Sequence, residues 1–529
     1  MKLRLAAIAA LALSCAIAEP MAATKSKKPF DVTEKSIAEL QQAMASGRTT
    51  SKAVTQQYLA RIKSIDKAGP KLNSVIEVNP DALKIAEALD RERREKGPRG
   101  PLHGIPVLIK DNIATADKMQ TTAGSLALVG VKPPRDAFLV AKLRDAGAVI
   151  LGKTNLSEWA NIRSTRSTSG WSSRGGLTRN PYSLDRNTSG SSSGSGAAIA
   201  ASLAAIAVGT ETDGSITSPS SVNGLVGIKP TLGLVSRAGI IPIAPSQDTA
   251  GPMARSVADA AVLLSAMAGS DPKDAATADA SLKASDYTRY LNRNALKGAR
   301  IGVVKKQFGG RNDLASAEVE KALEAMKAEG AILVDVAELP NTDKYGKTEL
   351  TVLYYELKAA MAAYLAEYAP GSKVKSLEDI VAYDEKNKSK VMPYFGQEHF
   401  LEAVKKGGLD TPEYIEALAT DLKYSREEGI DKVLRENNLD ALVAPTGSPA
   451  WMTDFIRGDA AGGGFTSPAA VAGYPHVTVP AGFVHGLPCG VSFVGTAWSE
   501  PKLIALAYAF EQATRYRRPP AYRKTVNDW

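Results

Sequence analysis

The chain has 529 residues, of which 44% are hydrophobic and 23% charged, a composition typical of a globular protein with a sizeable core. Its formal net charge is +9, but no dense Lys/Arg block and no interleaving of basic with aromatic residues occurs, so we assign the charge to solvated surface and expect no nucleic-acid partner. No group of Cys, His, Asp and Glu has metal-ligand spacing, and we expect neither a metal nor a cofactor.

The first 18 residues have the form of a signal peptide: two basic residues, an apolar run over 5–18 and a small-x-small cleavage site at its end. The run is too short for a stable membrane span. We therefore expect an exported protein, periplasmic or secreted, with no membrane association after cleavage. The alternative is a lipoprotein anchored at Cys15, but Ala12 stands where a large aliphatic residue is expected.

The chain has two cysteines, Cys15 and Cys489. Cleavage of the signal peptide would leave Cys489 alone, so no disulfide could form within the chain. Because Cys489 lies in the apolar string LPCGVSF, a buried structural role is favoured over a nucleophilic one.

Periodicity and turn residues divide the remaining chain into alternating helices and strands. The pattern predicts helices at Glu34–Ala45, Ser51–Ile65, 80–96, Ala137–Ala146, Ala315–Glu329 and Lys502–Arg515, and a mostly helical segment over about 341–438. It predicts strands at Ile105–Ile109, Ala148–Leu151, Arg300–Val304, Ile332–Val336 and Ala441–Ala444, and a hairpin within His476–Gly495. This order predicts an α/β fold with the sheet buried between helices, in one domain over 30–529 after a linker at 19–29. We expect the segment 341–438 to cover the sheet and shape a cleft.

The stretch Ser189–Pro219 combines two polar loops with an apolar segment between them. Residues 189–196 are a Ser/Gly run, residues 197–208 are apolar all round, and residues 209–215 are polar again. The apolar segment predicts a buried helix, and glycine-rich loops beside a helix offer free backbone N–H groups. We expect the two loops to meet over one end of this helix and to bring Ser191 close to Ser215.

These loops carry a resemblance to a known family. The string GSSSGS, followed by GTETDGSI, resembles the signature of the amidase signature family, and PLHGIPVLIKDNI, GLVGIKPT and QDTAGPM are similar to other motifs of that family. The resemblance extends from about Phe30 to the C-terminus and, within the family, is strongest to the peptide amidases. It implies one large mixed β-sheet covered by helices and hydrolysis of carboxamide bonds, with a small-molecule or short-peptide amide as substrate.

The resemblance also implies the catalytic residues: Ser215 as nucleophile, Ser191 as bridging serine and Lys110 as terminal base, with a cis peptide bond between Gly190 and Ser191. The relay requires a neutral lysine, whereas a free lysine, with a pKa of about 10.4, is almost fully charged at pH 7. Burial on the apolar strand that precedes Lys110 would lower its pKa. Asp111 is the next residue and should point to the other side of the extended strand. An ion pair between the two side chains would keep the lysine charged.

By the same resemblance, the backbone N–H groups of Thr212, Asp213 and Gly214 form the oxyanion hole. The sequence departs from the family pattern here, with Glu211 and Asp213 where Asp and Gly are more frequent, but a backbone donor survives such a change. The Asp213 carboxylate would either reject anionic substrates or hold a polar substrate group. Ala160 is carried over as a substrate-binding residue.

Two other motifs offer alternative sites. GAVILGKT at 147–154 matches the P-loop pattern, but a P-loop is a polar turn, and residues 148–151 are predicted to form a strand. GSSSG at 190–194 matches the nucleophile elbow with Ser192 as nucleophile, but an elbow follows an apolar strand, and residues 185–189 are polar. The four histidines are scattered, so a histidine-based triad is not expected.

Alternative functions are the amidase-type subunit of a tRNA-dependent amidotransferase, a hydrolase of another amide or ester class, and a catalytically inactive binding protein on the same scaffold. The signal peptide favours an exported amidase over the amidotransferase subunit, which needs protein and tRNA partners. The complete set of Lys110, Ser191 and Ser215 favours an enzyme over a binding protein.

Overall fold

The computed structural model describes residues 30–310 and 313–527. The signal peptide predicted over 1–18, the alternative anchor at Cys15 and the linker predicted over 19–29 lie outside these residues. The chain divides into a first unit, Met1–Asp31, of which only Phe30 and Asp31 are described, and a second unit, Val32–Trp529, which holds every described helix and strand.

The first two helices begin at capping side chains. Ser36 and Glu39 form a reciprocal capping box at the first helix, and the Thr50 hydroxyl accepts from the Ala53 N–H at the second. The described α-helices are α1 Ile37–Ala45, α2 Ser51–Arg61, α3 Ala82–Lys96, α4 Phe138–Asp145, α5 Ser193–Ala200, α6 Thr217–Val222, α7 Val257–Met267, α8 Ala280–Lys283, α9 Asp313–Ala328, α10 Thr342–Tyr368, α11 Leu377–Lys386, α12 Lys388–Val391, α13 Glu398–Val404, α14 Pro412–Ser425, α15 Asp431–Glu436, α16 Ser467–Ala472 and α17 Glu500–Thr514.

The strands form one large mixed sheet and one small ribbon. They are β1 Val75–Val78, β2 Pro106–Lys110, β3 Val149–Thr154, β4 Trp171–Ser172, β5 Gly176–Leu177, β6 Ile206–Glu211, β7 Val226–Lys229, β8 Thr249–Ala254, β9 Arg300–Val304, β10 Ile332–Val336, β11 Ala441–Pro445, β12 His476–Val484 and β13 Leu487–Val494. The 11-stranded sheet has the order β1-β3-β2-β6-β8-β7-β12-β13-β11-β9-β10, and β4 pairs with β5. The predicted α/β class with a single large mixed sheet is confirmed.

Parallel pairing in the sheet follows the two predicted strand–helix–strand units. Strand β2 runs parallel to β3 and β6, and β9 runs parallel to β10 and β11, whereas the other pairs are antiparallel. Each unit encloses one helix, α4 in the first and α9 in the second. The carboxyl ends of β2 and β6 therefore lie at the same edge of the sheet, and this edge positions the site.

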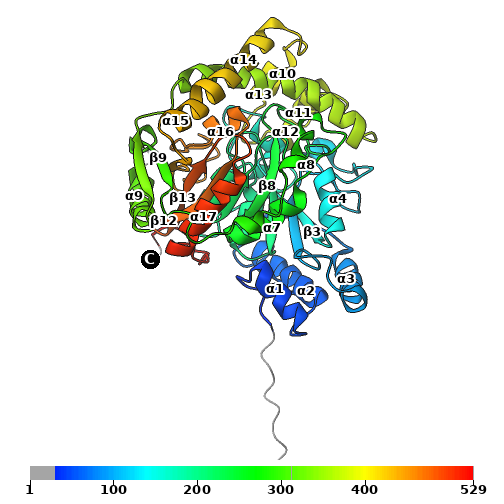
Figure 1. Cartoon of the computed structure of the whole chain (residues 1–529). Helices are drawn as coiled ribbons and strands as arrows, with labels where there is room; N and C mark the ends of the chain where they lie inside the picture. The colour runs from blue at the N-terminus through cyan, green and yellow to red at the C-terminus, as the bar shows by residue number, and fades with distance from the viewer. Residues whose placement is uncertain (1–29, 311–312, 528–529) are drawn as a thin grey trace, which may run out of the picture. The chain divides into compact units, whose positions relative to one another are not determined.

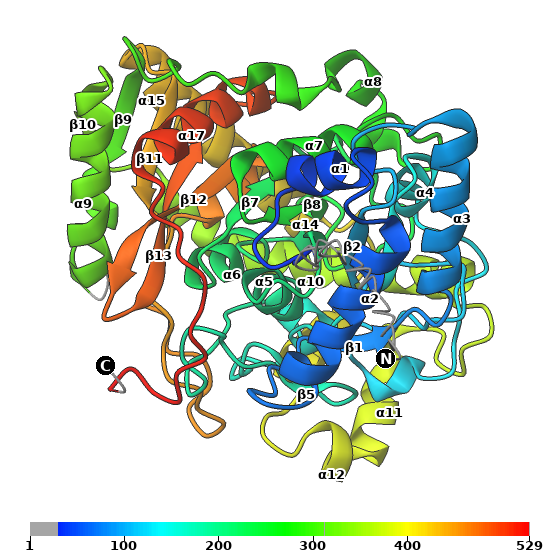
Figure 2. The ribbon, with the colours of Figure 1, turned by 90° about the horizontal axis from the view of Figure 1, so that it is seen from below.

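Helices cover both faces of the sheet. Helices α7 and α17 contact each other and lie against β8 and β12 on one face, while α5 and α6 contact each other and lie on the other face (Figures 1 and 2). The segment 341–438 is mostly helical, as predicted, and its helices α10 and α14 pack side by side across one end of the sheet (Figure 1). No helix in the described ranges has the length and apolar character needed to cross a membrane.

The prediction of a single buried helix over 197–208 is wrong. Helix α5 ends at Ala200, the chain turns through residues 201–205, and strand β6 begins at Ile206. Every residue of β6 is buried, and a fully buried strand has no polar alternation that distinguishes it from a buried helix. The two polar loops still meet, because helix α5 starts and strand β6 ends at the same edge: the Ser192 N–H donates to the Ser215 carbonyl at 3.1 Å.

Candidate active site

Lys110 is the last residue of strand β2 and is fully buried. Its Nζ lies 2.7 Å from Ser191 Oγ, 2.8 Å from Thr210 Oγ1 and 3.3 Å from the Thr210 carbonyl oxygen. A neutral amine has two N–H groups and one lone pair. The two Thr210 oxygens can accept the N–H groups, while the Ser191 hydroxyl donates to the lone pair. This arrangement fits a lysine that acts as a base toward Ser191.

No carboxylate of the described residues forms an ion pair with Lys110. Burial lowers the pKa of Lys110 to about 7, against the opposing effect of the Glu211 and Asp248 carboxylates. Asp111 points to the other side of the strand, as predicted, where it accepts from the Thr122 hydroxyl and forms an ion pair with Arg174 at 3.2 Å. Lys110 can therefore lose its proton near neutral pH.

Ser191 lies in the loop before helix α5, at the cis Gly190–Ser191 peptide bond that the family resemblance implied. A Cβ at position 190 would lie 2.2 Å from Ser157 Oγ, so a larger residue there would displace this hydroxyl. The Ser157 N–H holds the loop by donating to the Ser191 carbonyl at 3.1 Å. The Ser191 side chain is fully buried, and its hydroxyl contacts Lys110.

Ser215 lies at the end of the loop that follows β6 and is 8% exposed, the one member of the predicted triad with access to solvent. Within the described part of the chain its hydroxyl forms no hydrogen bond, so the expected contact between the Ser191 and Ser215 hydroxyls is not made. Catalytic hydrogen bonds often tighten only when substrate binds.

The loop of residues 212–214 precedes Ser215 and presents free backbone donors. Neither the Asp213 nor the Gly214 N–H donates a hydrogen bond to any described residue. Gly214 has φ 77°, a conformation that favours glycine. The Thr212 hydroxyl donates to Asp248 Oδ1 at 2.6 Å, and Gln247 Nε2 donates to the Thr212 carbonyl at 3.3 Å. Because that carbonyl is held, the Asp213 N–H on the same peptide points the opposite way.

Glu211 fixes the turn that carries Ser215. Its Oε2 accepts from the N–H groups of Ile216 at 2.7 Å and Thr217 at 2.9 Å, at the start of helix α6. Burial raises the pKa of Glu211, although the nearby Lys229 opposes this effect. The Glu211 side chain therefore supplies acceptors to two buried donors that the helix cannot satisfy itself.

Replacing Glu211 with Ala is expected to lower the free energy of unfolding by about 1–3 kcal/mol, because two buried N–H groups lose their acceptor. Glu211→Gln retains a side-chain carbonyl oxygen, so we expect a smaller loss. Urea unfolding of both variants and the wild type measures the difference. Equal losses in the two variants would contradict this role of the Glu211 oxygen.

The family model described as Amidase matches residues 53–504. The chain belongs to the amidase signature family. The structure superimposes on native peptide amidase from Stenotrophomonas maltophilia with a TM-score of 0.89 and 51% identity, covering 93% of this chain and 100% of that one. A probable amidase of Arabidopsis thaliana is 44% identical, covering 93% of this chain and 92% of the relative. One subunit of the glutamyl-tRNA(Gln) amidotransferase of Alkalilimnicola ehrlichii is 35% identical, covering 92% of this chain and 98% of the relative.

Ala160, predicted from the family resemblance to bind substrate, lies in an unusual backbone segment. Trp159, Ala160 and Asn161 have φ values of 53°, 53° and 78°, three successive residues in the left-handed region. Such conformations cost free energy and concentrate at functional sites. Ala160 is half-buried, whereas Trp159 is 2% exposed. The segment is ordered by packing of the Trp159 ring, edge-on, against Phe400 of α13 at 6.0 Å.

The structure excludes both alternative motifs. Ser192 is fully buried, and its hydroxyl bonds the Thr210 carbonyl at 3.0 Å and the Thr210 N–H at 3.2 Å, so it cannot reach a substrate as an elbow nucleophile. Lys153, the lysine of the P-loop pattern, lies on strand β3 with its Nζ bonded to Thr121 Oγ1 at 2.8 Å and to the Ile113 carbonyl oxygen at 2.5 Å. It is fully buried and cannot contact a phosphate.

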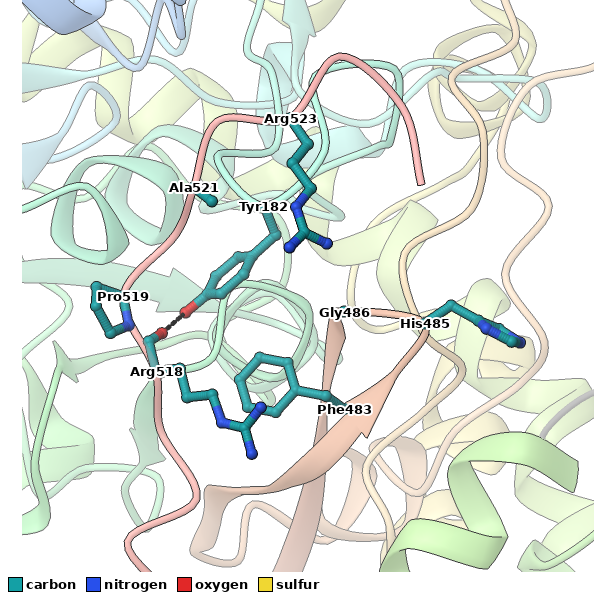
Figure 3. Close-up of a pocket in the computed structure, with 8 residues that line it drawn as sticks. All are labelled: Tyr182, Phe483, His485, Gly486, Arg518, Pro519, Ala521 and Arg523. Atoms are coloured by element: carbon teal, nitrogen blue, oxygen red, sulfur yellow. Dashed lines mark hydrogen bonds between the residues drawn. The ribbon is translucent and has the colours of Figure 1, made fainter. Parts of the chain in front are cut away.

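The histidines take no part in the site. His103 bonds the Leu89 carbonyl, His476 bonds Ser492, and His399 bonds Tyr354. His485 borders a separate cavity of about 430 Å³ between the β12–β13 turn and the C-terminal segment (Figure 3). There the Tyr182 hydroxyl donates to the Arg518 carbonyl and anchors that segment.

Cys489 is buried on strand β13, as predicted, and burial raises the pKa of its thiol to about 12. A thiol with this pKa stays protonated at neutral pH, which excludes a nucleophilic role. Among the described residues, no group of three or more His, Cys, Asp and Glu side chains is placed to hold a metal ion.

Several residues that support the site were not predicted. Thr210 holds Lys110, Gln247 and Asp248 hold Thr212, and Ser467 Oγ donates to Asp213 Oδ2 at 2.5 Å. Thr210 and Gln247 lie inside strings that resemble the family motifs, GTETDGSI and QDTAGPM. Their place in these motifs could have indicated a role near the site. Ser467 begins a short helix far along the chain, and no local pattern connects it with Asp213.

Proposed function

We propose that this amidase signature family hydrolase is an exported enzyme that removes the C-terminal amide of peptides through a relay of Ser215, Ser191 and Lys110. The observation that carries the relay is the 2.7 Å contact of a buried lysine, with a pKa lowered to about 7, to a buried serine beside an accessible one. The higher identity to peptide amidase than to the amidotransferase relative supports the substrate class. The sequence of residues 1–18 supports export.

In this reaction Lys110 Nζ accepts the Ser191 proton while Ser191 Oγ accepts the Ser215 proton, and Ser215 Oγ attacks the carbonyl carbon. The N–H groups of residues 212–214 stabilise the negative charge on the carbonyl oxygen. The intermediate breaks its C–N bond as the proton returns to nitrogen, so ammonia leaves and an acyl-enzyme remains. Water, activated by the same relay, then releases the carboxylate.

Turnover of a substrate panel tests the proposal. We expect ammonia release from peptide amides at rates well above those for simple carboxamides. The matched control is the same peptide with an N-methylated amide, which releases methylamine in place of ammonia and reports on the size of the leaving-group site. Preferential turnover of simple carboxamides would assign another amide class. No turnover of any amide or ester would instead support a binding protein.

A further inference from the structure

Two carboxyl groups meet at the oxyanion loop, residues 212–214. Asp213 of the loop accepts from the Ser467 hydroxyl at 2.5 Å through Oδ2, and from the Thr466 hydroxyl. Its other oxygen, Oδ1, is buried and meets no N–H or hydroxyl donor among the described residues. The carboxyl of Glu349 on helix α10 interacts with the Asp213 carboxyl. Two ionised carboxylates in contact repel, so this pair needs a proton between them.

Glu349 also reaches the other side of the loop. Its Oε1 accepts from Gln247 Nε2 at 3.0 Å, and the same amide group donates to the Thr212 carbonyl at 3.3 Å. Glu349 is thus linked through Gln247 to the carbonyl of the Thr212–Asp213 peptide unit, and its carboxyl also neighbours the Asp213 side chain.

We propose that Glu349 is a positioning residue of the oxyanion loop: its protonated carboxyl donates to Asp213 Oδ1 and, with Gln247, fixes the direction of the backbone N–H groups of residues 212–214 from helix α10. The inference rests on the proposed function of this loop. It gives the helical segment 341–438 a role in the reaction besides covering the sheet.

The surroundings of Glu349 favour its protonated form. Burial raises the pKa of Glu349 to about 8, and the neighbouring charges of Asp213 and of Asp421 on α14 add to this effect, whereas the hydrogen bond from Gln247 opposes it. Tyr345, one turn away on α10, also faces the two carboxyls, and burial raises its pKa far above neutral pH, so it stays uncharged there. Glu349 therefore holds the proton at pH 7.

The surroundings of Asp213 favour its ionised form relative to Glu349. Burial raises the pKa of Asp213, but the hydroxyls of Ser467 and Thr466, the Glu349 carboxyl and the charge of Lys229 on β7 lower it. Above about pH 8 both carboxyls would be ionised, the contact would become repulsive, and the loop would lose one of its anchors.

The variants Glu349→Gln and Glu349→Ala test the proposal through steady-state kinetics from pH 6 to 10. Glutamine can donate to Asp213 and accept from Gln247 but cannot ionise, so we expect a kcat near that of the wild type at pH 7 and no fall in rate above pH 8. Alanine removes both contacts, so we expect kcat to fall by about tenfold or more with little change in KM, because oxyanion donors act mainly in the transition state.

Asp421→Asn is the matched control. Asp421 is a second buried carboxyl facing α10, where it accepts from the Thr348 hydroxyl, and burial raises its pKa to about 7. Among the described residues it makes no hydrogen bond to the oxyanion loop, so its loss should keep the alkaline fall in rate and move it to lower pH, because the Asp421 charge raises the pKa of Glu349. A fall that disappears in Asp421→Asn but persists in Glu349→Gln would overturn the proposal.

Thermal unfolding separates this inference from the proposed function, because it needs no substrate. When folding raises the pKa of a carboxyl, the folded protein becomes less stable as the pH rises from the pKa of the unfolded state, about 4.5, to that of the folded state. The Tm advantage of Glu349→Gln over the wild type should therefore grow from pH 5 to about 8 and then level off. A constant difference across this range, or wild-type kcat in Glu349→Ala, would overturn the proposal even if the wild type hydrolyses amides.

Discussion

Ser215→Ala is expected to reduce kcat/KM on any amide substrate by at least about 10⁴-fold while the fold is kept, because loss of a nucleophile removes the covalent route entirely. Ser215 is the member of the predicted triad that substrate can reach, and its hydroxyl makes no bond to a described residue that folding would lose. Steady-state kinetics with circular dichroism of the variant measures both effects. Activity within about tenfold of the wild type, a difference of about 1.4 kcal/mol, would contradict the assignment.

Labelling identifies the nucleophile directly. A fluorophosphonate should modify Ser215, and peptide mass mapping should find the adduct there. Ser192→Ala is the matched control from the alternative elbow motif. The Ser192 hydroxyl bonds only the Thr210 backbone, so this variant should be less stable than the wild type but should still be labelled at Ser215. An adduct on Ser192 would reverse the assignment.

The sequence predicted the parts of the fold that depend on local pattern. The units β2–α4–β3 and β9–α9–β10 were predicted because apolar runs, helical periodicity and turn residues all agree over short distances. Strands β7 and β8 carry no such signal: β8 contains Gly251 and Pro252, residues that are rare inside strands and are accommodated here by pairing with β6 and β7. Their assignment needs the sheet around them.

The site also combines residues that local sequence predicts with residues that only the fold brings together. Lys110, Ser191 and Ser215 follow from strings that resemble the family, and the side of the strand taken by Asp111 follows from strand geometry. Glu349 does not follow from either source. It lies on α10, a long helix with no motif, and it comes near the loop after β6 only because the fold brings α10 across one end of the sheet (Figure 1).

Lys110→Ala is expected to lower kcat by about 10³-fold or more, because general-base catalysis contributes a factor of this order and the described site offers no substitute base near Ser191. Lys110→Arg should be as inactive, since a guanidinium does not deprotonate in proteins. Lys153→Met is the matched control: it removes a second buried lysine, on the neighbouring strand, that does not contact the relay. We expect this variant to unfold more easily and to keep its kcat in the folded fraction.

The pH dependence of the wild-type rate tests the role of Lys110 as the base more strongly than the substitutions do. Burial lowers the pKa of Lys110 to about 7, so the base is neutral above this pH and charged below it, and the rate should fall as the pH drops through about 7. Asp248 also titrates in this range, because burial raises its pKa to about 6, and it contacts the oxyanion loop at Thr212. Asp248→Asn separates the two groups. If Lys110 is the base, the variant loses rate at all pH values but retains an acid-side fall, moved to lower pH because the Asp248 charge raises the pKa of Lys110. A fall that vanishes in Asp248→Asn would assign the titration to the carboxyl and leave the relay without its base.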